Sequence, residues 1–276
     1  MANNFSADNN CKAVWNLESG ALTADSKGGN ILTNSGVDED LVNFKQGACS
    51  GLWVRANADY MTIADAALDS GFPLKSGEAN KSFSFTFWVR FANAAFYQYL
   101  MNKSGAYGNR SLIIYLYGNK IQLEISANGI AWNSYIHASA LSNNVWYHVG
   151  ITYDAEDDSY RIRIWDDTAQ AILGEDKVGT ATDILVSTAD LFLSLTGVNL
   201  GANLDEIAIF NDVLTADEID QIRAGTYGAV VGTNMKVNIG GVLKDVTEVK
   251  QNIGGVLKDV TEVKQNIGGV LKDVFG

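Results

Sequence analysis

Aromatic and amide side chains are concentrated in one short segment, residues 128–135, which reads Asn-Gly-Ile-Ala-Trp-Asn-Ser-Tyr. A protein holds a sugar by placing an aromatic ring against its C–H face and by pairing its hydroxyls with amide or acid groups, because unpaired buried polar groups are costly. The segment offers both kinds of group. We therefore predict a ligand-binding site at Asn128, Trp132, Asn133 and Tyr135.

A second and smaller set of the same kind lies upstream, where Tyr107 is followed by Asn109. We predict that these two residues also contact a ligand. The alternative for the longer segment is that Trp132 simply packs over the protein, as most tryptophans do.

The carboxylates and histidines are poorly arranged for catalysis. Hydrolysis of a glycosidic bond needs two carboxyl groups roughly 5–9 Å apart, one on each side of the bond. The densest acidic run, residues 154–158, lies between two apolar strands and is expected to be a solvated hairpin tip. His148 lies inside an apolar strand, and His137 has no Cys or His at metal-ligand spacing. Because H-E-x-x-H, G-x-S-x-G and P-loop patterns are also missing, we predict that the protein is not an enzyme.

The net charge of −12 limits the partners. Phosphate binding rests on clustered Lys and Arg, so we expect neither nucleic acid nor an anionic membrane surface as a partner. No stretch reaches the roughly 20 apolar residues of a membrane helix. The acidity suits either calcium binding or solubility alone. Cys11 and Cys49 are too few for a disulfide framework; we expect reduced thiols, although a pair is geometrically possible.

The elements that position these residues are strands. From residue 12 to 227 the sequence shows period-two alternation broken by turn clusters, which predicts an all-β, antiparallel sandwich. Strands are expected at 82–91, 112–116, 121–125, 145–153, 160–165 and 204–210, with Gly118-Asn119 as a hairpin turn. One short helix is predicted near the end, where Thr215 and Glu218 form a capping box and Gly225 provides the stop.

The C-terminal segment is built from repeats. Residues 238–251 recur unchanged at 252–265, and the first part of the unit returns at 266–274, which gives a period of 14 residues. Each unit places Gly-Gly between apolar flanks, a hairpin signal that would set Ile239 opposite Val242. A lone hairpin is marginal in water, so the three hairpins would either stack on one another or pair with copies from other chains. Because an exposed strand edge favours pairing, we predict a homo-oligomer. The expected domains are an N-terminal arm (1–10), a sandwich (11–230) and a repeat segment (231–276).

Four sequence blocks, in order along the chain, carry a family resemblance. They are AVWNLESG with DSKGGN (13–30), SFTFWVRF (84–91), VWYHVGITYD (145–154) and LDEIAIFNDVLTADEIDQI (204–222). Together they resemble the concanavalin A-like, laminin G-like family, which implies a jelly-roll sandwich over about four fifths of the chain. The terminal repeats resemble the Gly-Gly hairpin repeats near the ends of phage tail and virion appendage proteins.

The resemblance implies a calcium ion, which takes oxygen ligands. In the family, the Asp of the Asp-Glu strand commonly reaches such an ion beside the N-terminal loop. By position this implies Asp205, with Asp25 and Asn30 from the glycine-rich loop. The alternative is that Asp25 forms an Asx turn and Asp205 bonds backbone groups. Glu18 stands where the family more often has Asp, which weakens its case as a ligand.

The combined prediction is a non-enzymatic, phage-type virion protein with a tail-fibre, head-fibre or decoration role. Its partners would be a host-surface glycan or neighbouring virion subunits, bound by multivalent contacts. The N-terminus lacks a secretory signal, so we expect a virion protein that is made in the bacterial cytoplasm and released by lysis. The alternative is a carbohydrate-binding module of a bacterial surface protein. A third option is a degenerate glycoside hydrolase; the related glucanases carry a Glu-x-Asp-x-x-Glu strand that this chain lacks.

Overall fold

The computed structural model describes residues 3–228 continuously and, beyond them, only the strand residues 236–239, 242–245, 250–253, 256–259, 263–267 and 270–275. The chain divides into two compact units, Met1–Gly228 and Ala229–Gly276. Among the described residues, no helix is long and apolar enough to span a membrane.

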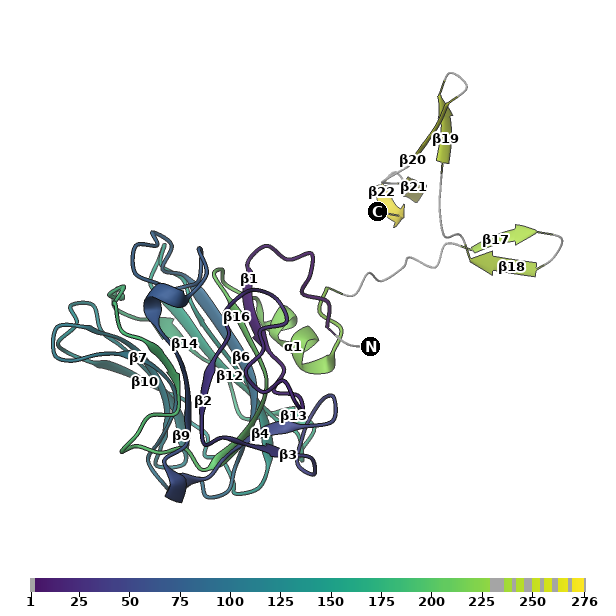
Figure 1. Cartoon of the computed structure of the whole chain (residues 1–276). Helices are drawn as coiled ribbons and strands as arrows, with labels where there is room; N and C mark the ends of the chain where they lie inside the picture. Colours follow the sequence, from purple (N-terminus) through teal and green to yellow (C-terminus); the bar gives the residue numbers. More distant parts are fainter. Residues whose placement is uncertain are drawn as a thin grey trace. The chain divides into compact units, whose positions relative to one another are not determined.

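The first unit is a sandwich of two antiparallel sheets (Figure 1). One sheet has nine strands in the order β13-β12-β11-β6-β16-β4-β3, with β1 also paired to β16 and β14 to β12. Its strands are β1 Cys11–Trp15, β3 Asp38–Asp40, β4 Ser50–Trp53, β6 Phe83–Phe91, β11 Trp146–Tyr153, β12 Ser159–Asp166, β13 Ala171–Ile172, β14 Lys177–Thr180 and β16 Ala202–Phe210.

The other sheet has seven strands in the order β10-β9-β8-β7-β15-β5-β2. Its strands are β2 Thr33–Ser35, β5 Tyr60–Ile63, β7 Gln98–Ser104, β8 Arg110–Tyr117, β9 Lys120–Ile125, β10 Asn133–Ile136 and β15 Leu191–Leu193. Two 3₁₀ turns, Arg55–Asn57 and Asp65–Ala67, flank β5. The predicted all-β sandwich is confirmed.

The core lies between the sheets because the strands alternate as the sequence predicts. Phe83, Phe85 and Phe87 of β6 point inward and share one buried cluster with Leu112 and Ile114 of β8. The turn between β8 and β9 has positive φ at both Gly118 and Asn119 (57° and 63°), which is the backbone that a two-residue hairpin requires.

Helix α1, Ala216–Ala224, covers the outer face of the nine-stranded sheet. Thr215 accepts a hydrogen bond from the Glu218 amide, and the Glu218 side chain accepts one from the Thr215 amide, so the predicted capping box is present. Ile219 lies directly over Gly150 of β11, where an added Cβ would come within 2.6 Å of Ile219 Cγ2. A glycine in this strand therefore lets the helix approach the sheet.

The thiols and the repeats complete the fold. Cys11 and Cys49 are both free and buried. In the repeats, three two-stranded sheets pair β17 Lys236–Ile239 with β18 Val242–Asp245, β19 Lys250–Ile253 with β20 Val256–Asp259, and β21 Val263–Ile267 with β22 Val270–Phe275. Ile239 lies opposite Val242, the register expected from the Gly-Gly pattern. Their role in oligomerisation stays a prediction.

Candidate functional site

Two loops at one end of the seven-stranded sheet bring together the predicted aromatic residues. Tyr107 lies in the loop between β7 and β8, and Trp132 in the loop between β9 and β10. The Gly108 amide donates to the Gly129 carbonyl at 2.8 Å and joins the loops. A side chain at position 129 would meet that neighbouring backbone, since a Cβ there would lie 2.4 Å from the Gly108 oxygen.

Arg110, at the start of β8, links the two rings. Its Cζ atom lies 5.8 Å from the Tyr107 ring centroid and 5.7 Å from that of Trp132. Both distances fall within the range of cation–π attraction. Arg110 Nη1 donates to the Ile130 carbonyl at 2.8 Å, which holds the guanidinium in place. Tyr107 is 72% exposed, so this arrangement, the loop site, is open to solvent.

The predicted amides at these loops are engaged within the protein. Asn128 Oδ1 accepts from the Ile130 and Ala131 amides at 2.9 and 3.0 Å, an Asx-type turn that shapes the loop. Asn109 Oδ1 accepts from the Thr188 amide at 3.1 Å and fastens a third loop beside the first two. These residues therefore position the loop site.

Asn133 and Tyr135 lie in strand β10 and contact a different segment. Asn133 Nδ2 donates to Thr182 Oγ1 at 3.2 Å, and the Tyr135 hydroxyl accepts from the Thr182 amide at 2.9 Å. The Tyr135 ring packs 4.5 Å from that of Tyr160. The structure thus divides the predicted set: Tyr107 and Trp132 share one arginine, and the other four residues support the surrounding loops and strand.

Sequence reasoning missed a row of tyrosines on the seven-stranded sheet. Tyr97 lies 5.3–5.5 Å, centroid to centroid, from the rings of Tyr99, Tyr115 and Tyr117. Tyr117 is 60% exposed, whereas the Tyr115 hydroxyl is buried and donates toward Gln122 Oε1 at 2.8 Å. The sequence does contain a signal for this row, because Tyr115 and Tyr117 alternate with the core residues of β8.

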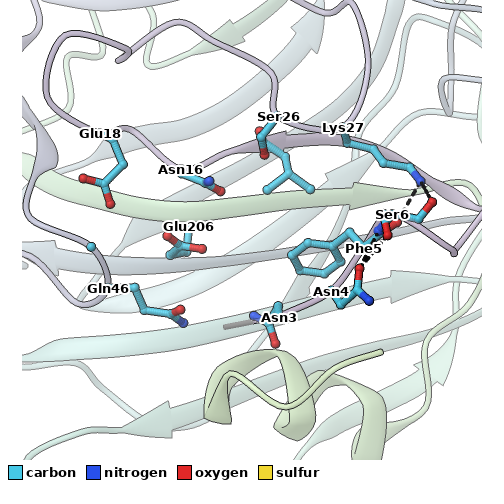
Figure 2. Close-up of a pocket in the computed structure, with 12 residues that line it drawn as sticks. Asn3, Asn4, Phe5, Ser6, Asn16, Glu18, Ser26, Lys27, Gln46 and Glu206 are labelled. Carbon is cyan, nitrogen blue, oxygen red and sulfur yellow. Dashed lines mark hydrogen bonds between the residues drawn. The ribbon is translucent and has the colours of Figure 1, made fainter. Parts of the chain in front are cut away.

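A cavity of about 530 Å³ lies against β1 and β16 of the nine-stranded sheet, and Figure 2 shows the side chains that line it. Asn16 and Glu18 follow β1, Gln46 comes from the loop before β4, and Glu206 comes from β16. Phe5 of the N-terminal arm lines the opposite wall. We call this the acidic pocket.

Local backbone features determine where the carboxyl groups of this pocket lie. The pairing of β16 with β6 is irregular between Asp205 and Ala208, and Glu206 has φ 51°, an uncommon conformation for a side chain of this kind. A Cβ at Gly47 would lie 1.3 Å from Glu18 Oε1, so the glycine provides the space that the Glu18 carboxylate fills.

Burial perturbs both acids of β16. It raises the pKa of Glu206 to about 8, with the nearby Asp205 charge as the next cause. It also raises the pKa of Asp205 to about 7, against hydrogen bonds from the Lys45 and Gln46 amides that lower it. The second oxygen of Asp205, Oδ1, is buried without a hydrogen-bond partner.

The predicted calcium ligands form two separate sets. Asp25 accepts hydrogen bonds from the Val14 and Lys27 amides and from the amide groups of Asn30. Asn30 Oδ1 accepts from the Asp69 amide, so the oxygens of this loop face donors. Asp205 contacts the loop at 45–46 instead.

The metal ligands do not converge in this arrangement. Among the residues that the structure describes, no group of three or more His, Cys, Asp or Glu side chains could hold a metal ion. As they stand, Asp25, Asn30 and Asp205 do not fit one calcium ion, and calcium stays a prediction.

The histidines lie away from these surfaces. His148 is 2% exposed against the Trp88 ring at 5.1 Å, and His137 is fully buried. The acidic run at 154–158 forms the tip between β11 and β12, as expected.

Comparison with known proteins identifies the family and the fold of the chain. A family model described as "Concanavalin A-like lectin/glucanases superfamily" matches residues 55–220, which is more than half of the chain. No curated protein matches the sequence.

Among solved structures, the binding domain of Paraclostridial Mosquitocidal Protein 1 is similar with a TM-score of 0.59 and 16% identity over 78% of this chain and 52% of that one. A botulinum neurotoxin type C structure, whose title concerns interaction with two ganglioside molecules, has a TM-score of 0.54 and 14% identity over 79% and 51%. The binding domain of botulinum neurotoxin DC in complex with SialylT has a TM-score of 0.59 and 12% identity over 96% and 73%.

These identities show a shared fold alone. The chain spans about half the length of the first two of these structures. The ligands named in their titles are therefore statements about those longer proteins.

Proposed function

Because the chain belongs to the concanavalin A-like lectin/glucanases superfamily, we propose that it is a non-enzymatic, lectin-like protein that binds a glycan at the loop site. The observation that carries this proposal is the placement of Tyr107 and Trp132 around the Arg110 guanidinium on two exposed loops. Aromatic faces pack against the C–H side of a sugar, and a guanidinium pairs with its oxygen atoms.

The arginine favours a glycan that carries a carboxylate. Within residues 3–228 the Arg110 side chain donates one hydrogen bond, from Nη1 to Ile130, so its remaining N–H groups can face a ligand. A guanidinium matches a carboxylate in a two-point contact. The neighbouring structures that name a ganglioside and SialylT support a glycan ligand in this fold.

A glycan array with the full chain tests the loop site. We expect Arg110→Ala and Trp132→Ala each to weaken binding to acidic glycans by at least about tenfold, since each removes a central contact. The matched control is Tyr117→Ala, which removes an exposed aromatic ring from the tyrosine row. Unchanged binding in Arg110→Ala together with loss in Tyr117→Ala would move the glycan to that row and overturn the proposal.

The absence of catalysis is part of the same proposal. His148 and His137 are buried, and of the two perturbed acids of β16 Glu206 lines the acidic pocket whereas Asp205 is buried against the loop at 45–46. Incubation with a panel of glucans should therefore leave them intact. Release of reducing ends above a buffer control would contradict this and favour the third option, a relative of the glycoside hydrolases.

We further propose that the protein is a phage-type virion appendage, in which the repeats join several sandwiches. Support comes from the unchanged 14-residue repeats and their three hairpins. Host-surface glycans and neighbouring virion subunits are the proposed partners. A carbohydrate-binding module of a bacterial surface protein is the alternative, and capsid or tail genes beside the coding gene would decide between them.

A further inference from the structure

The acidic pocket holds polar groups that the fold does not use. In the described part of the chain, the side chains of Asn16, Gln46 and Glu206 have no hydrogen-bond partner, although all three line one cavity. Figure 2 shows them on one side of the cavity with Glu18 beside them. Groups that are partly desolvated without a partner gain from a ligand that supplies one.

The carboxyl groups of Glu18 and Glu206 set the charge of the cavity. Because the pKa of Glu206 is raised to about 8, an ammonium ligand would bind at neutral pH with release of the Glu206 proton. Among the described residues that line the cavity, Lys27 is the one cation, and its Nζ donates to the carbonyls of Phe5 and Ser6 at 2.7 and 3.1 Å. Glu18 and Glu206 face the cavity, and Asp205 lies behind them with a partnerless buried oxygen. The charges of Asp205 and Glu18 add to burial in raising the pKa of Glu206, as expected for carboxyl groups that repel each other. A positive group between them would relieve this repulsion.

The size of the cavity argues for an organic ligand. About 530 Å³ is far more than one ion needs, and the described acids are not grouped to hold a metal. A simple alkylamine would pair with the carboxyl groups but would leave the two amides without partners. A sugar ring adds hydroxyls for Asn16 and Gln46 and a C–H face for the Phe5 ring.

We propose that the acidic pocket binds an amino sugar with a free ammonium group, with Glu206 and Glu18 as its counter-ions and Asn16 and Gln46 as hydroxyl partners. This site is separate from the loop site and does not depend on it. The N-terminal arm completes it, because Asn4 donates to the Tyr227 carbonyl at 2.8 Å and Phe5 packs against Phe210 and Tyr227.

Calorimetric titration of the full chain with D-glucosamine at neutral pH tests this site. We expect saturable binding of D-glucosamine and at least about tenfold weaker binding of N-acetyl-D-glucosamine, since acetylation removes the charge that the acids recognise. Glu206→Gln should weaken D-glucosamine binding by at least about tenfold, because it keeps the shape and removes the counter-ion. The matched control is Glu156→Gln, the same change at an exposed hairpin tip.

Three outcomes overturn the proposal. They are no D-glucosamine binding by the folded chain, equal binding of the two sugars, and unchanged binding in Glu206→Gln. Calcium chloride alone is the final arm: a calcium isotherm that Glu206→Gln abolishes, without any for D-glucosamine, would assign the pocket to a metal. Arg110→Ala should leave D-glucosamine binding intact, so that failure of the loop site and failure of this site are distinguishable.

Discussion

The buried histidine of β11 should make the sandwich sensitive to mild acid. His148 is 2% exposed, and its Nε2 has no hydrogen-bond partner among the described residues. The pKa of His148 is lowered from 6.5 to about 3, chiefly by burial, with smaller contributions from the charges of Arg223 and Arg163 and an opposing one from Asp220. The folded protein therefore keeps His148 neutral at a pH where the unfolded chain takes up a proton.

The sign and size follow from this difference. As pH falls below 6.5, proton uptake stabilises the unfolded state alone, so the folded state loses stability until the pH reaches its own pKa near 3. At pH 5 the pH lies about 1.5 units below the His148 pKa of the unfolded chain. This difference corresponds to a loss of about 2 kcal/mol in the free energy of unfolding. This figure barely changes if the folded pKa is one unit higher, because pH 5 still lies above it.

The assay is urea unfolding followed by tryptophan fluorescence at pH 7.5 and pH 5, for the natural chain and for His148→Gln. Between pH 7.5 and pH 5, the free energy of unfolding should fall by about 2 kcal/mol more in the natural chain than in the variant. Asp205 and Glu206, whose raised pKa values favour the folded state as pH falls, titrate in both proteins and cancel. Equal pH dependence within about 0.5 kcal/mol would refute the reasoning.

Three further predictions address the helix, the ion and the repeats. Gly150→Ala should destabilise the sandwich by about 1–3 kcal/mol in thermal or urea unfolding, because its Cβ would meet Ile219 at 2.6 Å. A second change, Ile219→Ala, should recover part of that loss. An unchanged unfolding midpoint in Gly150→Ala would contradict the close packing. Calcium should leave the melting temperature of the natural chain unchanged, because Asp25, Asn30 and Asp205 do not converge on one ion; a rise that Asp205→Asn abolishes would contradict this and restore the ion. The full chain should run as an oligomer in size-exclusion chromatography with light scattering and residues 1–228 as a monomer; two monomers would contradict the assembly role of the repeats.

Much of the fold could be predicted because local rules and tertiary packing agree. In β6, the alternation of Phe83, Phe85 and Phe87 with small polar residues identifies the core face without any knowledge of the partner sheet. The helix is equally local, since Thr215 and Glu218 form their cap within four residues. What the pattern lacked was the strand order, which depends on pairings between distant segments such as β6 and β16.

The functional surfaces were harder to predict because they arise where segments meet. Trp132 and Tyr107 were identified by composition, but Arg110 became part of the site only because two loops approach each other. Glu206 could not be predicted at all, since nothing in the sequence indicates that a glutamate adopts φ 51° at an irregular strand pairing. Lys103 is a similar case: it is 1% exposed and paired with Asp65 at 2.6 Å, although its neighbours suggest an ordinary strand.

The exposure of the loop site gives the proposed assembly through the repeats a testable consequence. Tyr107 is 72% exposed, so a single sugar there would stay largely in water and its contacts would exclude little solvent. A surface site of this kind binds weakly by itself, because it is not desolvated in the way that strong contacts are. Copies joined through their C-terminal hairpins would face a glycan-covered surface together, and the second contact would then form at a high effective concentration. Residues 1–228 should therefore bind a soluble acidic glycan as well as the full chain does, yet lose retention on a surface that displays the same glycan densely.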